Sequence, residues 1–264
     1  MSERFGRMNM EHRFERLSSS QIGEAIREGA VILIPVGQVE EHGPHLPVHT
    51  DWLIADELSL EAARRLEGEI RVLAMTGIVY GYSTSHLAKW PGTIRLRQET
   101  VTAMGFDICR SLVEMGFRRI IFVSQHGHHY GLMRSLARRI WDEIETDVAV
   151  IFPAGMAEPS FKKMCRGGPG SSCHACELET SLMLHIAPEL VDMEKAPRGD
   201  RLQPSAFGSS EVFWSTWNRQ QSVSGAYGEP SFATVETGKV VFDAIVSRMA
   251  EFIREYNAKS PTAR

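Results

Sequence analysis

The segment GQVEEHGPHLPVHTD, residues 37–51, concentrates side chains that can bind metal ions. It directly follows the apolar run VILIPV at residues 31–36, which predicts a buried strand. Glu40 and His42 are two residues apart, so in an extended chain both side chains point to the same side. Asp51 follows where an amphipathic helical pattern begins. Oxygen and nitrogen ligands without thiolates are typical of sites for Zn, Mn, Fe or Co.

A second histidine cluster, SQHGHHYG, follows the apolar run RRIIFVS at residues 118–124. It places His126 and His128 on either side of Gly127, which permits a tight turn. Taken singly, such histidines are more often ordinary surface or core residues, and Asp51 is a plausible helix N-cap. Their concentration favours a metal site, because seven of the ten histidines lie in three short stretches: His42, His45 and His49; His126, His128 and His129; and His174. An aspartate that bridges through both oxygens suits two ions about 3.5–4 Å apart.

The elements that must position these residues alternate along the chain. Since strand and helix follow one another, we expect an α/β domain with a largely parallel sheet covered on both faces. In such sheets ligands bind beyond the carboxyl ends of the strands, where both clusters fall. Residues 188–234 fit neither the helical nor the strand period of apolar residues and are expected to form long loops. The patterns predict helices at 18–29, 51–68, 97–116, 129–145, 174–187 and 234–256, and strands at 31–36, 70–75, 78–81, 118–124 and 147–155.

The composition limits the classes of partner. A net charge of -4 gives no electrostatic reason to bind nucleic acid or an anionic membrane. No run of about eighteen apolar residues and no signal-peptide pattern is present, so we expect a cytoplasmic protein. Four cysteines are too few for a disulfide scaffold of this length and are expected to be thiols. We expect one domain over residues 1–264, with an N-terminal extension at 1–15 and a polar tail at 258–264.

Five stretches, in order, resemble the motifs of the creatininase (creatinine amidohydrolase) family: GQVEEHGPHLPVHTD, GYSTSHLAKWPGTI, SQHGHH, HACELETSLML and SGAYGEPSFAT. The resemblance implies a single-domain three-layer α/β/α sandwich with a mostly parallel sheet, assembled as a homohexamer. It also implies two divalent metal ions per chain, zinc with manganese or iron as alternatives. The metal ligands that it implies are Glu40, His42, Asp51, His126 and Glu179.

A water molecule between two divalent ions has a pKa lowered from about 15.7 toward neutrality, so hydroxide is available to attack a carbonyl carbon. The resemblance implies His174 as the catalytic acid and base, and a pKa near 6.5 suits both roles. Glu179 is expected to take part in catalysis as well as in metal binding. The chain is therefore expected to be a metal-dependent hydrolase of a small cyclic or amide substrate.

Two departures from the family pattern bear on the substrate. His128 and Cys173 stand where creatininases carry acids, so creatinine itself is not the expected substrate. These two residues and His86 are expected to contact the substrate, and Trp90 and Trp217 are candidates to line the pocket. One alternative is a C–C hydrolase that opens a cyclic diketone such as 3-dehydro-scyllo-inosose in inositol catabolism. A further alternative is a metal-binding protein without catalytic activity.

Overall fold

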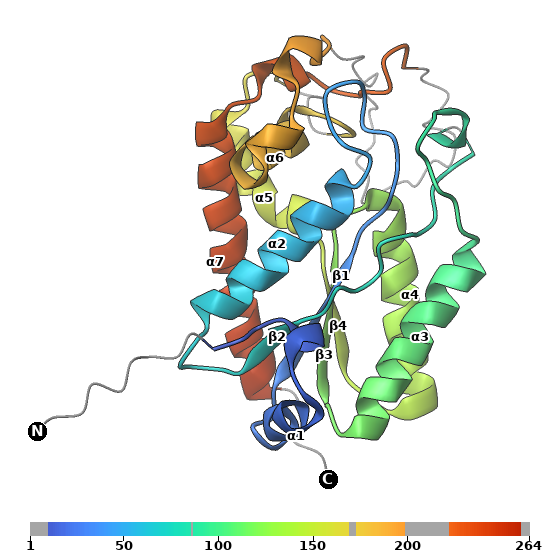
Figure 1. Cartoon of the computed structure of the whole chain (residues 1–264), viewed down its shortest axis with the longest axis vertical. Coiled ribbons are helices and arrows are strands. Elements are labelled where there is room, and N and C mark those ends of the chain that lie inside the picture. Colours follow the sequence, from blue (N-terminus) through green and yellow to red (C-terminus); the bar gives the residue numbers. More distant parts are fainter. Residues whose placement is uncertain (1–9, 86, 169–172, 199–221, 260–264) are drawn as a thin grey trace, which may run out of the picture.

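The structure, a computed structural model, describes residues 10–85, 87–168, 173–198 and 222–259 (Figure 1). Its centre is a sheet of four strands, β1 (Val31–Val36), β2 (Val72–Ala74), β3 (Arg119–Ser124) and β4 (Val148–Ile151). The strand order is β2-β1-β3-β4, and every pair is parallel. In the register of β1 and β3, Val36 lies opposite Ser124, so the two histidine-bearing segments leave the sheet at the same edge.

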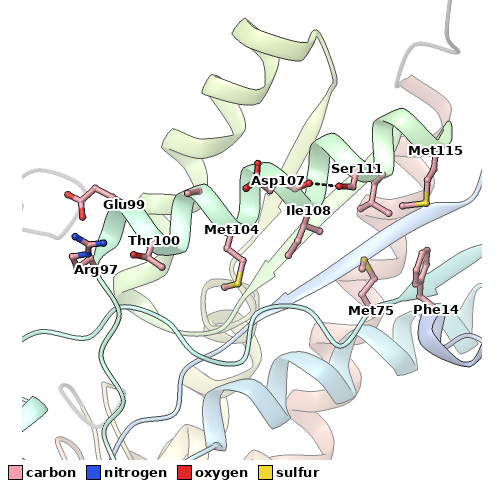
Figure 2. Close-up of a pocket in the computed structure, with 12 residues that line it drawn as sticks. Phe14, Met75, Arg97, Glu99, Thr100, Met104, Asp107, Ile108, Ser111 and Met115 are labelled. Atoms are coloured by element: carbon pink, nitrogen blue, oxygen red, sulfur yellow. Dashed lines mark hydrogen bonds between the residues drawn. The ribbon is translucent and has the colours of Figure 1, made fainter.

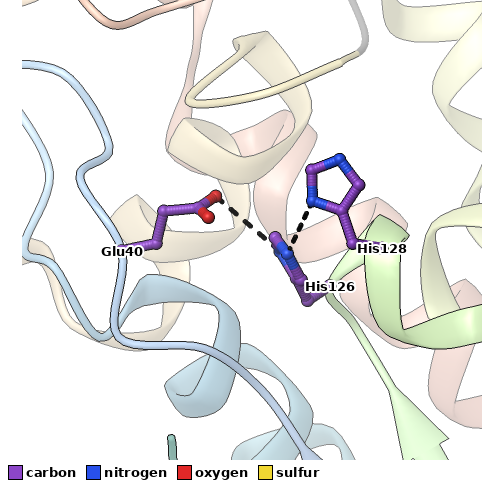
Figure 3. Close-up of side chains that lie close together, drawn as sticks. All are labelled: Glu40, His126 and His128. Carbon is purple, nitrogen blue, oxygen red and sulfur yellow. Dashed lines mark hydrogen bonds and ion pairs between the residues drawn. The ribbon is translucent and has the colours of Figure 1, made fainter. Parts of the chain in front are cut away.

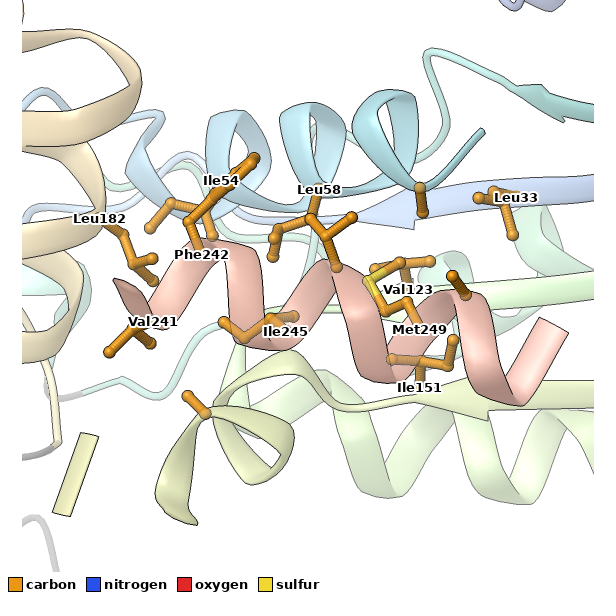
Figure 4. Packing of buried hydrophobic residues seen from close by; sticks show 14 of the residues in the cluster. Leu33, Ile54, Leu58, Val123, Ile151, Leu182, Val241, Phe242, Ile245 and Met249 are labelled. Carbon is orange, nitrogen blue, oxygen red and sulfur yellow. The ribbon is translucent and has the colours of Figure 1, made fainter. Parts of the chain in front are cut away.

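The sheet is covered on both faces, and its strands are apolar at almost every position; the exceptions, Arg119 and Ser124, are the two ends of β3. Val31 and Leu33 of β1 face one apolar cluster, and Ile32 and Ile34 face the other, as the two-residue period of a strand requires. The first cluster is completed by α2 (Thr50–Arg65), α5 (Pro153–Met164), α6 (Glu177–Ile186) and α7 (Val235–Lys259), and Figure 4 shows its packing around α7. The second is completed by α1 (Ser19–Arg27), α3 (Gln98–Met115) and α4 (Gly127–Ile144).

These three layers confirm the predicted α/β/α fold and its parallel sheet. A strand was predicted at residues 78–81, but the structure has none there. Ile78 makes only an isolated bridge to Val36. Helix α5 was not predicted, because Pro153 and Pro159 interrupt its pattern, although a proline in the first turn suits a helix. Helix α6 begins at Glu177, later than predicted, and α7 continues to Lys259, into the predicted tail.

The predicted loop region contains short 3-10 helices at Pro188–Leu190, Met193–Lys195 and Pro230–Phe232. Two more stand at Phe14–Arg16 and Leu87–Lys89. In the N-terminal segment the Arg13 guanidinium forms a bidentate ion pair with the buried carboxylate of Asp56 in α2. Among the described residues, no helix combines the length and apolar character needed to cross a membrane.

Candidate metal centre

The loop after β1 passes very close to the start of α2. A Cβ atom on Gly37 would lie 2.1 Å from the Cα atom of Trp52, so only glycine fits there. This approach brings Asp51, the second residue of α2, to the edge of the sheet where Glu40 and His42 lie. The N-cap of α2 is His49, so the alternative role of Asp51 as a helix N-cap is wrong.

Asp51 lies between histidines that come from different segments. Its Oδ1 is 3.4 Å from Nε2 of His42, and its Oδ2 is 2.8 Å from Nδ1 of His126. All three side chains are almost completely buried. The two oxygens of one carboxylate thus face two different imidazoles, so Asp51 would be the residue to bridge two cations if each imidazole bound one.

Around Asp51 the metal-capable side chains form two groups. The first group consists of Glu40, His126 and His128 (Figure 3). Glu40 Oε1 is 3.8 Å from Nδ1 of His126, and Nδ1 of His128 is 3.1 Å from Nε2 of His126. The other oxygen of Glu40 accepts a hydrogen bond from the buried hydroxyl of Ser83, which fixes the carboxylate plane.

The second group consists of His42, His174 and Glu179. Nδ1 of His42 donates a hydrogen bond of 3.0 Å to the backbone carbonyl of Glu40, so Nε2 is the nitrogen turned toward Asp51. The rings of His42 and His174 lie 4.4 Å apart between their centroids. Glu179, in the first turn of α6, completes this group with a buried carboxylate.

Glu40 Oε1 and His42 Nε2 are buried and make no hydrogen bond of good geometry, and Asp51 Oδ2 has only Nδ1 of His126 beside it, at 2.8 Å. Because these atoms converge, the imidazoles of His42 and His126 must carry protons to offset the carboxylates when no metal is bound. Divalent cations bound by neutral imidazoles and the carboxylates would replace those protons. Carboxylate and imidazole are also the donors that divalent transition metals prefer. The residues present therefore fit a pair of divalent metal ions.

The pKa values of the histidines in these groups follow from their burial and from the charged groups packed around them. Burial opposes charge on His42, but the carboxylate of Asp51 outweighs it and raises the pKa of His42 to about 10. Burial likewise opposes charge on His126, while Glu40 and Asp51 raise its pKa to about 9. Burial and the neighbouring His126 lower the pKa of His128 to about 3, so its imidazole is neutral. Without metal, protons on His42 and His126 supply the positive charge that Asp51 and Glu40 attract.

His174 does not start helix α6, as the sequence suggested, but lies three residues before it in a short antiparallel bridge with Tyr227. Its backbone N–H donates to Tyr227 at 3.2 Å, and the N–H of Tyr227 donates back at 2.8 Å. Its ring Nε2 donates a hydrogen bond of 2.8 Å to the carbonyl of Glu41. The other ring nitrogen, Nδ1, lies 3.5 Å from Oε1 of Glu40.

Sequence reasoning missed two residues that support the site. Glu41 is buried, and its Oε1 is 3.3 Å from Nε2 of His174. The other carboxylate oxygen of Glu41 packs against Gly225, where a Cβ atom would lie only 2.2 Å away. Ser83, which holds Glu40, was also missed. Both lie inside motifs of the resemblance, so the signal was present, but no spacing rule connects Glu41 with a histidine 133 positions away.

Of the remaining predicted site residues, Cys173 and Trp90 lie in the described part of the chain, whereas His86 and Trp217 do not. Cys173 is outside both metal-capable groups, and burial, with Cys176 and Glu179 nearby, raises the pKa of its thiol. Trp90 is half-buried, with the ammonium of Lys89 5.9 Å from its ring centroid. His86 and Trp217 lie outside the described residues.

A groove of about 820 Å³ lies elsewhere, along the outer face of α3 (Figure 2). Its walls include Met104 and Met115 of α3, with Phe14 and Met75 opposite. None of its lining residues belongs to the two metal-capable groups. This groove is therefore separate from the metal-capable side chains at the carboxyl edge of the sheet.

Comparison with known proteins gives the family. The creatininase family model, described as creatinine amidohydrolase, matches residues 15–253. A mycofactocin precursor peptide peptidase of Mycobacterium ulcerans (strain Agy99) is 31% identical over 237 residues, which are 84% of this chain and 85% of that protein. Creatinine amidohydrolase of Pseudomonas putida is 27% identical over 85% of this chain and 89% of its own length. The 3-dehydro-scyllo-inosose hydrolase of Thermotoga maritima (strain ATCC 43589 / DSM 3109 / JCM 10099 / NBRC 100826 / MSB8) is 23% identical over 95% of this chain and 85% of its own length.

Solved structures agree with this assignment at the level of the fold. A manganese form of creatininase superposes with a TM-score of 0.78 at 24% identity, covering 96% of this chain and 100% of that one. A creatininase mutant of the Zn–Zn type gives a TM-score of 0.82 at 23% identity, with the same coverage of both chains. The family match spans the sheet, both metal-capable groups and most of α7. The chain belongs to the creatininase (creatinine amidohydrolase) family and is a metal-dependent hydrolase.

Proposed function

We propose that the protein hydrolyses an amide C–N bond of a small substrate, with two divalent cations held by Glu40, His42, Asp51, His126 and Glu179. The observation that carries this proposal is the position of Asp51, whose two oxygens face His42 and His126. When bound, the cations supply a water molecule of lowered pKa and a Lewis acid for the carbonyl oxygen. Zinc is the first metal to test, followed by manganese and iron.

The proton transfers are assigned to His174. Its Nε2–H is held by the carbonyl of Glu41, so Nδ1 is the atom that takes and returns a proton on the side of the metal groups. A group that moves a proton in both directions needs a pKa not far from neutrality, and the ordinary value for histidine is near 6.5. Burial lowers the pKa of His174, but the nearby carboxylates of Glu41, Glu40 and Glu179 outweigh it and raise the pKa above that value. Glu179 lies on the same side as His174, and we assign it to the second cation and to the orientation of the departing group.

The substrate is proposed to be a cyclic amide or a short amide other than creatinine. Two relatives have names that denote a peptidase and an amidohydrolase, and both match more than four fifths of the chain. His128 and Cys173 replace two acids of the creatininase pattern, so the charged contacts that those acids offer are missing here. We propose that His86, His128 and Cys173 contact the substrate.

Metal analysis combined with a substrate panel tests the proposal. The purified protein is expected to hold about two divalent ions per chain and to release an amine or ammonia from a cyclic amide or peptide. Asp51→Ala is expected to abolish both properties, because it removes the proposed bridging carboxylate. A wild-type protein that binds the metal yet hydrolyses none of the panel would contradict the amide assignment.

A second candidate reaction is C–C hydrolysis of a cyclic diketone. It is favoured by the match to 3-dehydro-scyllo-inosose hydrolase over 95% of this chain. Attack on a carbonyl carbon is common to both reactions, and only the leaving group differs. Products without ammonia or amine, and with a new carboxylate, would select this reaction over amide cleavage.

The assembly and the cellular location stay predictions. A homohexamer would give about six times the chain mass of 29.6 kDa in light scattering after gel filtration. Fractionation of the producing cells would test the expected cytoplasmic location.

A further inference from the structure

We infer that Tyr82 determines substrate specificity, because its ring and the ring of His128 form a corner that receives a flat ring of the substrate. This inference rests on the proposed function, since it narrows the substrate class of the same site. It also gives a role to His129, the third histidine of the SQHGHH turn, which holds Tyr82 in position.

The backbone of Gly81 and Tyr82 is held by side chains from the two segments that follow β1 and β3. The N–H of Gly81 donates a hydrogen bond of 2.6 Å to Oε1 of Gln38, in the loop after β1. The N–H of Tyr82 donates a hydrogen bond of 2.7 Å to Nε2 of His129, in the first turn of α4. The same two segments carry Glu40, His126 and His128, so the position of Tyr82 is fixed relative to the metal-capable side chains.

His129 suits this positioning role because its ring lies directly against Gly81. A Cβ atom on Gly81 would lie 2.3 Å from Nε2 and 2.0 Å from Cε1 of the ring, so only glycine fits without moving it. Since Nε2 accepts the hydrogen bond from Tyr82, Nε2 carries a lone pair and the proton of the ring is on Nδ1. His129 is completely buried and outside both metal-capable groups, so we assign it to positioning and not to metal binding.

The ring of Tyr82 lies beside His128. The two ring centroids are 6.2 Å apart and the ring planes meet at 74°. Tyr82 is half-buried, since part of its ring packs against the second apolar cluster and the rest is accessible. The next residue, Ser83, donates its hydroxyl to Glu40, so Tyr82 stands next to the first metal-capable group. The two rings thus form a nearly right-angled corner at the edge of that group.

Such a corner selects substrates by shape. Aromatic rings prefer partners that stack with an offset on their face or meet them edge to face. A flat ring, as in a cyclic imide or ureide, can stack on one of the two side chains and meet the other with its edge. A saturated ring is puckered and cannot lie flat against either. We therefore expect the site to favour flat cyclic amides over puckered lactams.

Steady-state kinetics of the metal-loaded protein test the inference with two probes, the flat ring of hydantoin and the puckered ring of 2-piperidone. For the wild type, we expect kcat/KM to be higher for hydantoin by about tenfold, the upper range for an aromatic pair. Tyr82→Ala is expected to raise the KM for hydantoin by about the same factor, with kcat and the KM for 2-piperidone preserved. Tyr82→Phe keeps the ring and should retain the wild-type preference.

Variants of His129 test how Tyr82 is positioned. His129→Leu removes the acceptor for the N–H of Tyr82 and is expected to raise the KM for hydantoin as Tyr82→Ala does. His129→Gln restores an acceptor and should restore the KM. If His129 acts through Tyr82, the double variant has no larger effect than either single variant. Tyr80→Ala is the matched control, because Tyr80 is 51% exposed and lines a groove without any of the metal-capable residues.

Metal content and circular dichroism of every variant verify that the site is loaded and the chain is folded. If His129→Leu does not fold, Tyr82→Ala and Tyr82→Phe decide the matter. Equal kcat/KM values for the two probes in the wild type, or an unchanged KM for hydantoin in Tyr82→Ala, would overturn the inference and leave amide hydrolysis in place.

Two other results separate this inference from what it rests on. Additive effects of His129→Leu and Tyr82→Ala would overturn the role of His129. A wild-type protein that cleaves a peptide but neither ring would overturn the flat-ring substrate class, whereas one that cleaves no amide at all would overturn the proposed function itself.

Discussion

The two metal-capable groups are assembled in different ways. The first group comes from the loop after β1 and the turn after β3, two neighbouring strands whose ends are aligned by the sheet. The second group adds His174, which depends on a bridge to Tyr227 and on the start of α6. Parallel strand ends thus fix the first group through the sheet, whereas the second depends on pairing between segments far apart in the chain.

The largest effect on both groups is expected from Gly37→Ala. The added methyl would meet the backbone of Trp52 at 2.1 Å, so the start of α2 must move and carry Asp51 away from both groups. Overpacking of this kind costs about 1–3 kcal/mol, and we expect a lower melting temperature together with loss of both bound metals. Thermal denaturation and metal analysis measure these effects. Gly131→Ala is the matched control, since it adds a methyl where nothing lies within 4 Å.

Gly225→Ala is expected to disturb the second group and leave the first group unchanged. Its methyl would lie 2.2 Å from Oε2 of Glu41, so the side chain that contacts His174 must shift. We expect hydrolysis to slow by about 100-fold, the lower range for a displaced acid and base, while both metals stay bound. The turnover number and the metal content of the same sample provide the measurement. Gly168→Ala has a similar backbone strain, with φ of +73° against +84°, but nothing within 4 Å, so it should retain the wild-type rate.

Ser83→Ala tests the first group in isolation. The hydroxyl of Ser83 donates to Glu40, and removal of such a supporting hydrogen bond lowers metal affinity by about 10–100-fold. The loss is expected for one of the two cations in a metal titration, with the affinity for the other preserved. Ser111→Ala is a suitable control, because its hydroxyl donates to the carbonyl of Asp107 in its own helix. An equal loss for both cations would contradict the assignment of Glu40 to one of them.

The smallest effect concerns the pH dependence of the metal-free protein. His42 and His126 have pKa values raised to about 10 and about 9, above their unfolded value near 6.5. Their contribution to the free energy of unfolding is therefore complete below about pH 6.5 and is lost as the pH rises through 9–10. We expect the melting temperature of the metal-free protein to fall by at least about 3 °C between pH 7 and 10. The zinc-loaded protein, in which cations replace these protons, should fall by less over the same interval.

The convergence of Glu40, His42 and His126 was predictable from the sequence. Glu40 and His42 follow an apolar strand at a spacing of two, and His126 follows a second strand, so the rules for parallel sheets bring them to one edge. The pattern could not reveal that Gly37 lets α2 approach this edge. That approach, rather than the capping preference of aspartate, determines the position of Asp51.

His174 and Glu179 of the second group were predicted only through the family resemblance. No local period connects His174 to Tyr227, because an antiparallel bridge between distant segments has no signature in either segment alone. Helix α5 was missed for a different reason. Its two prolines argue against a helix, but Pro153 occupies the first turn, and the apolar residues Ala157 and Phe161 pack against α7 and stabilise the rest.

Asp51 also stands in the first turn of α2, where the backbone N–H groups of the helix present a partial positive charge of about half an elementary charge. The peptide dipoles of α2 therefore balance part of the charge on this carboxylate whether or not a cation is present. The helix therefore lowers the free-energy cost of burying this carboxylate in the metal-free protein.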